Sequence, residues 1–360
     1  MIIYKNVFEK IISLENLFSA WDKFKNNKQK KRDVQYFEWR LEENIFQLHR
    51  DLESRNYGHG AYTSFYIRDP KQRHIHKATV RDRILHHAIF AALNPIFEPT
   101  FIFNSLSCRI DKGTHKGIDI LDKLTRQVSN NAFKSCFVLK CDIRKFFETI
   151  DHKILLDIIR KRIKDANAMW LLEEIIESFT SRYSTFLERK GLPIGNLTSQ
   201  LFANIYLNEF DQFIRHKLKV KNYIRYTDDF VIVAEDKSYL ENLIVPIRTF
   251  LSDKLALELH PKKITIRKFH QGIDFLGYII LPYCRLLRTK TRQRIFKKLE
   301  KRIKEYKEGK ITKQILEQSL QSYLGVLSHA NTYKLEQELK NQFWFWLTSE
   351  PYSPPELLDL

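Results

Sequence analysis

The sequence predicts an α+β fold in which a sheet in the middle of the chain is flanked, in sequence, by helical segments. Residues 1–60 and the residues after 281 carry apolar side chains at helical spacing. The middle of the chain contains short runs of alternating apolar and polar residues, which is the pattern of half-buried strands. The chain has 360 residues, of which 43% are hydrophobic, so it is long enough for two or three packed subdomains.

Each element is expected from its own local pattern. A basic run at residues 24–32 separates two amphipathic helices near the N-terminus and is expected to be a solvated loop. The two apolar faces consist of Ile12, Leu17, Phe18 and Trp21, and of Phe37, Leu41, Ile45 and Leu48. Residues 57–77 alternate and contain Asp69-Pro70, which predicts a hairpin that turns there. Further along, the patterns predict a helix at 81–97, a strand at 137–143, one long amphipathic helix at 198–219 and a strand pair at 223–234.

The composition narrows the class of partner and the compartment. Lys and Arg number 61 against 43 Asp and Glu, and the resulting net charge of +18 predicts a polyanionic partner. A merely soluble basic protein is the alternative. The four cysteines have no Cys-x-x-Cys spacing and favour a reducing compartment. The N-terminus has no signal-peptide pattern and no apolar run approaches the roughly 20 residues of a membrane span, so a cytoplasmic protein without membrane contact is expected.

Three carboxylates carry the chemical prediction. Asp228 and Asp229 lie at the tip of the predicted strand pair, and Asp142 ends the predicted strand at 137–143. Each has an ordinary explanation, because Asp favours turns and caps helices. If the strands pair, however, Asp142 and Asp228 converge, and such carboxylates repel one another unless cations neutralise them. Because Mg²⁺ prefers oxygen ligands, the pattern predicts a two-metal site for phosphoryl displacement.

A set of motifs, in order across roughly residues 60–285, resembles the reverse transcriptase family. The motifs are the segment from Phe137 to Phe147, the box Tyr226-Thr227-Asp228-Asp229, Leu259-His260-Pro261-Lys262-Lys263 and Phe275-Leu276-Gly277-Tyr278. Thr227 stands where Met or Ala is commoner. The resemblance implies an RNA-directed DNA polymerase with a right-hand fold of fingers, antiparallel palm sheet and helical thumb. It also implies that Asp142, Asp228 and Asp229 are catalytic and, with Ile143, hold two Mg²⁺ ions, for which Mn²⁺ can substitute.

The same resemblance divides the chain into parts. It implies an N-terminal helical extension at 1–60, fingers at 61–135, a palm at 136–284 with helices at 151–190, a thumb at 285–345 and a tail at 346–360. No RNase H, endonuclease or maturase domain is expected after residue 345.

The segment from Gly191 to Gln200, Gly-Leu-Pro-Ile-Gly-Asn-Leu-Thr-Ser-Gln, most resembles the reverse transcriptases of diversity-generating retroelements. Other bacterial members usually carry Gln at the position of Ile194 and Ser-Pro at the end of the box. This resemblance implies retrohoming by error-prone copying of a template RNA into cDNA, with errors at template adenines, and a small basic accessory variability protein. The alternatives are another bacterial reverse transcriptase, of retron, group II-like or antiviral-defence type, and a catalytically silent nucleic-acid-binding module.

Roles around the nucleotide follow from the resemblance and from charge. A dNTP carries an anionic triphosphate, so Arg73, with Arg68 and Lys71 beside it, is expected to bind it, although a solvated hairpin explains the same residues. Phe147 stands where the family places a ring under the sugar, which would exclude a 2′-hydroxyl. A core phenylalanine is the alternative for Phe147 and the expectation for Phe146. The other residues expected near the nucleotide are Ile194, Gly195, Gln200 and Lys263, of which Lys263 is expected to neutralise charge near the metals.

The basic C-terminal region predicts a nucleic-acid contact. Residues 285–313 hold thirteen basic and three acidic residues. An apolar stripe there predicts a thumb helix whose cations lie along an RNA–DNA hybrid, held by shape and phosphate contacts rather than by base readout. The stripe is Phe296, Leu299, Ile303 and Tyr306, and the predicted contacts are Arg292, Arg294, Lys298 and Lys301.

Overall fold

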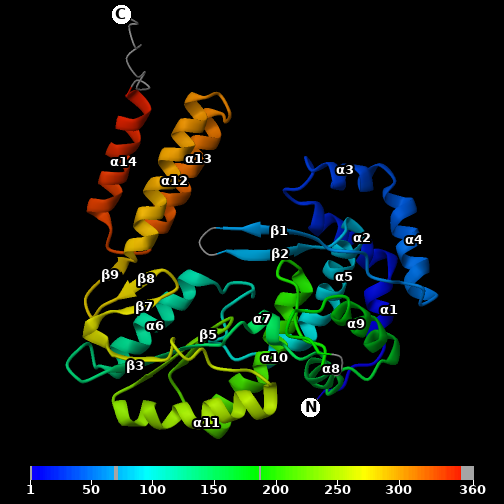
Figure 1. Cartoon of the computed structure of the whole chain (residues 1–360), viewed down its shortest axis with the longest axis horizontal. Helices are drawn as coiled ribbons and strands as arrows, with labels where there is room; N and C mark the ends of the chain where they lie inside the picture. Colours follow the sequence, from blue (N-terminus) through cyan, green and yellow to red (C-terminus); the bar gives the residue numbers. More distant parts are fainter. Residues whose placement is uncertain (1, 69–71, 186–187, 350–360) are drawn as a thin grey trace, which may run out of the picture. The chain divides into compact units, whose positions relative to one another are not determined.

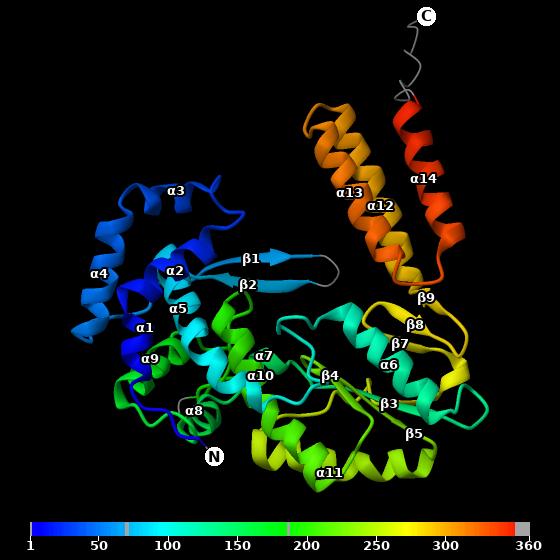
Figure 2. The same cartoon turned by 180° about the vertical axis from the view of Figure 1, so that it is seen from behind.

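The structure is a computed structural model that describes residues 2–68, 72–185 and 188–349. The chain forms two units (Figures 1 and 2). The first is built from residues up to 113, 139–232 and 237–265, and the second from 114–138, 233–236 and 266 onward. Both contain helices and strands, which confirms the α+β class. Within the described residues, no helix is long and apolar enough to cross a bilayer.

The N-terminal helices are shorter than predicted. The Ser13 side chain accepts a hydrogen bond from the Asn16 N–H and so caps a new helix, which separates α1 (Val7–Ile12) from α2 (Leu14–Lys25). The sequence had predicted that Ile12 shares a helix with Leu17, Phe18 and Trp21, and this prediction is wrong. A second break at Arg40 separates α3 (Arg32–Trp39) from α4 (Leu41–Glu53).

The hairpin and the helix after it form as predicted. β1 (Thr63–Ile67) and β2 (Arg73–Lys77) pair antiparallel, while the predicted turn at Asp69-Pro70 lies outside the described residues. α5 (Val80–Phe97) is capped by Thr79, whose side chain accepts a hydrogen bond from the Asp82 N–H. Because α5 packs against both α2 and α10 (Leu197–Gln212), most of its residues are buried.

The central sheet has the strand order β4-β5-β3-β6. Its strands are β4 (Tyr223–Tyr226), β5 (Asp229–Ala234), β3 (Phe137–Asp142) and β6 (Thr265–Lys268). β4 and β5 pair antiparallel with Tyr226 opposite Asp229, which confirms the predicted strand pair. Phe230, Val231 and Ile232 are fully buried, so the middle of β5 is covered on both faces.

The predicted amphipathic helix at 198–219 is wrong in two respects. α10 ends at Gln212 and continues as a π-helical turn over Phe213–Lys217. It is also buried around most of its circumference, since every residue from Leu201 to Leu207 is buried. The reason is that α10 packs between α5 and α8 (His152–Arg160), whereas an amphipathic helix has one solvated side.

The second unit contains a small sheet of order β7-β8-β9 and the C-terminal helices, which lie side by side in Figures 1 and 2. The predicted helix at 285–313 is shorter, because Arg285 lies in β9 (Arg285–Leu287). Its buried stripe uses Ile295, not Phe296. The predicted fingers, palm and thumb boundaries stay predictions. The remaining elements are α6 (Thr114–Val128), α7 (Phe146–Thr149), α9 (Ala166–Glu177), α11 (Lys237–Leu255), β7 (Ile273–Phe275), β8 (Tyr278–Ile280), α12 (Thr289–Lys307), α13 (Lys313–Leu327) and α14 (Tyr333–Thr348).

Candidate functional site

The three predicted aspartates meet at one end of the central sheet. Asp142 is the last residue of β3, and Asp229 is the first residue of the neighbouring strand β5. The Ile143 N–H donates to the Asp228 carbonyl oxygen at 3.2 Å, which ties the end of β3 to the turn that carries Asp228. Strand pairing therefore brings together carboxylates that lie far apart in the sequence.

The carboxylates share one electrostatic environment. Burial, together with the charges of Asp229 and Asp142, raises the pKa of Asp228 from 3.8 to about 6, while Lys263 opposes the rise. Such a shift means that the protein leaves negative charge at this position incompletely neutralised. A cation placed there would relieve the repulsion.

Lys263 is the cation that the chain itself supplies. Its Nζ lies 2.8 Å from an Asp142 carboxylate oxygen, and the Asp142 side chain is largely buried. The loop that presents Lys263 is anchored to the strand end, because the His260 N–H donates to the Asp142 carbonyl at 2.8 Å and the Lys263 N–H donates to the His260 carbonyl. Lys263 is thus held beside the carboxylates, where the sequence had placed it.

The donor set suits a hard divalent cation. As the side chains stand, the described residues contain no group of three or more His, Cys, Asp or Glu arranged to hold a metal ion, and the Asp142 carboxylate is instead paired with Lys263. The carboxylate oxygens, which are ligands that Mg²⁺ prefers, nevertheless belong to residues at the same end of the sheet. Ile143 and Leu259 form an antiparallel β-bridge. Its two hydrogen bonds run from the Arg144 N–H to the Glu258 carbonyl and from the His260 N–H to the Asp142 carbonyl, so the bridge does not use the Ile143 carbonyl oxygen.

Phe147 and the 191–200 box lie against each other. Phe146 is buried, as predicted, whereas Phe147 on the same short helix α7 is partly exposed. The Leu192 N–H donates to the Phe147 carbonyl at 2.7 Å. This bond fixes the backbone that carries the Phe147 ring relative to the start of the box.

The box also packs against the hairpin. The His76 N–H on β2 donates to the Ile194 carbonyl at 3.1 Å, and the Ile194 side chain is partly exposed. Gly195 has a φ of +131°, and a Cβ there would lie 3.1 Å from the His76 carbonyl oxygen, so only glycine fits without a shift. Gln200 is partly exposed on the first turn of α10.

The predicted triphosphate ligands belong to the hairpin. Arg73 begins β2 and Arg68 follows β1, and both side chains are exposed. Lys71 lies outside the described residues. Arg73 and His76 lie on the same strand, β2, and the His76 N–H is hydrogen-bonded to the Ile194 carbonyl.

The predicted nucleic-acid contacts lie on α12 of the second unit. Arg292, Lys298 and Lys301 are exposed and Arg294 is partly exposed. The Arg292 guanidinium donates to both carboxylate oxygens of Glu338 on α14, and Lys301 Nζ lies 3.8 Å from Glu305. Arg292 and Lys301 therefore have acidic neighbours within their own unit.

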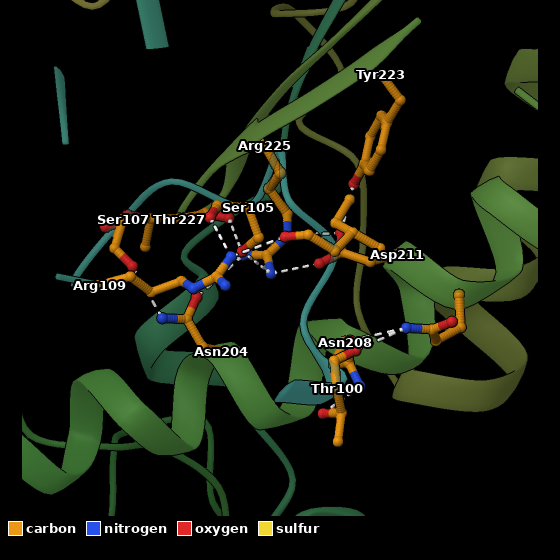
Figure 3. A network of polar contacts seen from close by, with 12 residues as sticks. Thr100, Ser105, Ser107, Arg109, Asn204, Asn208, Asp211, Tyr223, Arg225 and Thr227 are labelled. Carbon is orange, nitrogen blue, oxygen red and sulfur yellow. Dashed lines mark hydrogen bonds and ion pairs between the residues drawn. The ribbon is translucent and has the colours of Figure 1, made fainter. Parts of the chain in front are cut away.

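Sequence reasoning missed a buried charge network under the Tyr226–Asp229 box (Figure 3). Arg225 on β4 and Asp211 on α10 are both fully buried, and Arg225 Nη2 lies 2.6 Å from Asp211 Oδ2. The signal was present, because Arg225 is the one charged residue in the otherwise uncharged strand Tyr223-Ile224-Arg225-Tyr226. A charge in a buried strand indicates a buried partner.

Comparison with known proteins places these observations in a family. A family model described as reverse transcriptase (RNA-dependent DNA polymerase) matches residues 68–280. Protein YkfC of Escherichia coli K12 is 28% identical over 246 residues, covering 59% of this chain and 62% of YkfC. The group II intron-encoded protein LtrA of Lactococcus lactis is 24% identical over 305 residues, covering 66% of this chain and 50% of LtrA. The chain thus spans only half to three-fifths of the length of these relatives.

Among solved structures, a telomerase from Candida albicans, in complex with a fragment of telomeric RNA, has a TM-score of 0.47 at 11% identity, covering 82% of this chain and 61% of that chain. The segment matched by the family model is more than half of the chain and contains Asp142, Asp228, Asp229 and Lys263. The chain belongs to the reverse transcriptase (RNA-dependent DNA polymerase) family.

Proposed function

We propose that this protein is an RNA-directed DNA polymerase that copies a non-coding template RNA into cDNA. The observation that carries the proposal is the meeting of Asp142, Asp228 and Asp229 at one sheet end, with Lys263 beside them. Membership of the reverse transcriptase family supports it. The proposed substrates are dNTPs, and the proposed nucleic-acid partners are the template RNA and the RNA–DNA hybrid.

Each group of residues has its own proposed role in binding metal ions and the dNTP. Two Mg²⁺ ions, or Mn²⁺ in their place, held by the three carboxylates and the Ile143 carbonyl, would supply Lewis acidity and neutralise charge on the phosphates. Lys263 neutralises Asp142 in the protein alone. Arg73, with Arg68 and Lys71, is proposed to bind the triphosphate, and the partly exposed Phe147 ring to lie under its sugar.

The finer proposal is an error-prone enzyme of a diversity-generating retroelement that works with a small basic accessory protein. It is supported by Ile194 and Gln200 in the 191–200 box. The partly exposed Ile194 side chain has no polar group with which to bind a nucleotide. The similarity to LtrA, a group II intron-encoded protein, favours a second candidate, a group II-like reverse transcriptase. A silent binding module is the third.

One experiment separates these proposals. The purified chain is given a primed RNA template, dNTPs and Mg²⁺, and the cDNA is sequenced. Extension with errors concentrated opposite template adenines supports the diversifying enzyme. Extension with few errors, evenly spread over the four template bases, favours the group II-like enzyme. Binding of the primed RNA without extension would refute the polymerase.

Ile194→Gln is expected to lower misincorporation, most visibly opposite template adenine. A glutamine amide can hydrogen-bond the incoming nucleotide and fix its position, so a displaced mispair loses a bond that a correct pair keeps. A difference of about 1.4 kcal/mol corresponds to a tenfold change in discrimination. The measurement is deep sequencing of cDNA from both enzymes on one RNA at matched extension.

Ile194→Leu is the matched control, because it keeps an apolar side chain of the same volume. Its error spectrum should resemble that of the parent. Identical spectra for Ile194→Gln and the parent would mean that Ile194 only packs, with its carbonyl bound by His76.

Affinity for the RNA–DNA hybrid is expected to fall steeply with salt, because cations on α12 release counterions from the phosphates. Reversing Arg292, Arg294, Lys298 and Lys301 to Glu should flatten the slope of log affinity against log salt by about one unit for each phosphate that is no longer neutralised. The measurement is fluorescence anisotropy of a labelled hybrid. An unchanged slope would place the nucleic-acid track elsewhere, for example on the basic run at 24–32.

A further inference from the structure

The buried ion pair under the catalytic turn is bonded more extensively than an ion pair requires. Arg225 Nε donates to Asp211 Oδ1 at 2.8 Å, and Nη2 donates to Asp211 Oδ2 and, at 2.9 Å, to Ser105 Oγ. Nη1 donates to the Thr227 carbonyl oxygen at 3.1 Å and approaches Asn204 Oδ1 at 3.4 Å. Each of the five N–H groups of the guanidinium therefore faces an acceptor (Figure 3).

One of those acceptors belongs to the peptide next to Asp228. The Thr227 carbonyl is part of the Thr227–Asp228 peptide, so Arg225 holds the peptide plane before Asp228. The peptide plane after Asp228 is held as well, because its carbonyl accepts the Ile143 N–H at 3.2 Å. Asp228 thus lies between two fixed peptide planes, and these set the direction of its Cα–Cβ bond.

Thr227 supplies a second anchor for the same turn. Its φ of +55° is unusual for a β-branched residue, so the turn needs outside support. The Thr227 hydroxyl donates to Ser107 Oγ at 2.7 Å, and the Ser107 carbonyl accepts from Asn204 Nδ2 at 2.9 Å. The Thr227 hydroxyl therefore anchors the turn. Met or Ala, which are commoner at this position, have no hydroxyl and could not make this hydrogen bond.

The network is anchored to the fold on both sides. Ser105 and Arg225 form a parallel bridge, in which the Arg225 N–H donates to the Asn104 carbonyl and the Leu106 N–H donates to the Arg225 carbonyl, each at 3.0 Å. Asp211 also accepts from the Tyr223 hydroxyl at 2.8 Å. The carboxylate is therefore fixed on α10 and the guanidinium on β4.

We infer that Arg225, held by Asp211, is a positioning residue that keeps the Asp228 carboxylate beside Asp142 through the Thr227–Asp228 peptide, with the Thr227 hydroxyl as a second anchor. The inference rests on the proposed function for its catalytic consequence. Its structural part, that the network preorganises a metal-binding carboxylate, can be measured without catalysis. Lysine cannot replace arginine here, because three donors on one atom do not reach acceptors on three segments.

The test measures Mn²⁺ binding to the chain in the absence of nucleotide, with electron paramagnetic resonance as the readout. A thermal unfolding curve of each variant shows whether it is folded. The double variant Arg225→Met/Asp211→Leu removes both charges and so leaves no unpaired buried charge. It should fold and bind Mn²⁺ about tenfold more weakly than the parent, a loss of about 1.4 kcal/mol. Tyr206→Phe is the matched control, since it removes a buried hydrogen bond from α10 to the Leu255 carbonyl and leaves Arg225 untouched. It should lose stability and keep the parental Mn²⁺ affinity.

Thr227 gives a second, milder comparison that does not depend on the fold of the double variant. Thr227→Val is isosteric and lacks the hydroxyl, so its Mn²⁺ affinity should fall about threefold, whereas Thr227→Ser keeps the hydroxyl and should stay within about twofold of the parent. Parental Mn²⁺ affinity in both the folded double variant and Thr227→Val would overturn the inference. So would a parent that binds no Mn²⁺.

Primer extension adds the catalytic readout. The double variant should lower kcat at least tenfold while the KM for dNTP changes less than about twofold, because the network touches no substrate. A parallel rise in KM with unchanged kcat would contradict a positioning role. If the parent fails to extend a primer on RNA, the proposed function fails, and the Mn²⁺ comparison still decides whether Arg225 positions Asp228.

Discussion

Asp228→Asn is expected to reduce RNA-templated primer extension by about a thousandfold. Asparagine has nearly the same size as aspartate but carries no charge, so it removes a negative charge from the metal site. Metal stabilisation of the transferring phosphate is worth several kcal/mol, and a loss of about 4 kcal/mol corresponds to a thousandfold lower rate. Asp142→Asn should behave similarly, while Asp229→Asn is expected to be milder if Asp229 is the more distant ligand.

The measurement is the single-turnover extension rate on a primed RNA at saturating Mg²⁺. Asp253→Asn, which removes one exposed carboxylate from α11, is the control for a change in net charge. A rate for Asp228→Asn within about tenfold of the parent would end the catalytic assignment of this residue.

The same substitution is expected to stabilise the protein in the absence of divalent metal. The pKa of Asp228 is raised in the folded state to about 6 from 3.8, so between these values the folded chain binds more protons than the unfolded chain. The free energy of unfolding therefore falls as pH rises through this window, and the loss is complete above it. A shift of this size corresponds to about 3 kcal/mol at most. At pH 7, Asp228→Asn should be more stable than the parent by up to that amount.

The pH dependence supplies the check. The stability difference between Asp228→Asn and the parent should shrink as pH is lowered from 7 towards 4, because the parental carboxyl then becomes neutral. Urea unfolding of both proteins with a chelator present, at several pH values, measures it. A difference that is independent of pH, or an asparagine variant that is less stable at pH 7, would contradict the electrostatic account of the site.

Phe147→Ala is expected to raise ribonucleotide incorporation about a hundredfold relative to dNTP incorporation. The ring is partly exposed on α7 and its backbone is held by the Leu192 N–H, so it can form a rigid wall under a sugar. Removing the wall admits a 2′-hydroxyl that otherwise collides with it. A change of about 2.7 kcal/mol in relative transition-state binding gives this factor. The measurement is the ratio of kcat/KM for dNTP and rNTP on one template.

Phe146→Ala is the control that distinguishes a loss of sugar selectivity from a loss of core packing. Phe146 is buried, so truncation there should cost about 3 to 5 kcal/mol of stability and leave sugar selectivity near the parental value. Phe147→Ala should show the opposite pattern, with a small loss of stability and a large loss of selectivity. Parental discrimination in Phe147→Ala would make Phe147 a packing residue.

The sequence by itself predicted strands β1 to β5 correctly and also predicted the chemical type of the site. Alternation and turn residues are properties of a few adjacent positions, and they sufficed for β1 to β5 and for the turn at Thr227. The three aspartates and Lys263 were predicted as site residues because their types and order match those of a family. The apolar pattern alone did not predict where one helix ends and the next begins. Ser13 lies inside a continuous apolar stripe, yet its side chain caps a new helix there.

The tertiary structure decided which of these residues meet. Lys263 and Asp142 are 121 residues apart in sequence, and Arg225 and Asp211 belong to a strand and a helix whose packing no local pattern specifies. The burial of α10 on most of its sides likewise depends on α5 and α8. Hydrophobic periodicity reports whether a residue faces water or the core, but the free energy of a buried charge depends on the partner that packing places within about 3 Å of it. The pair of Arg225 and Asp211 holds the Thr227–Asp228 peptide through the Thr227 carbonyl, and this pair exists only in the folded chain.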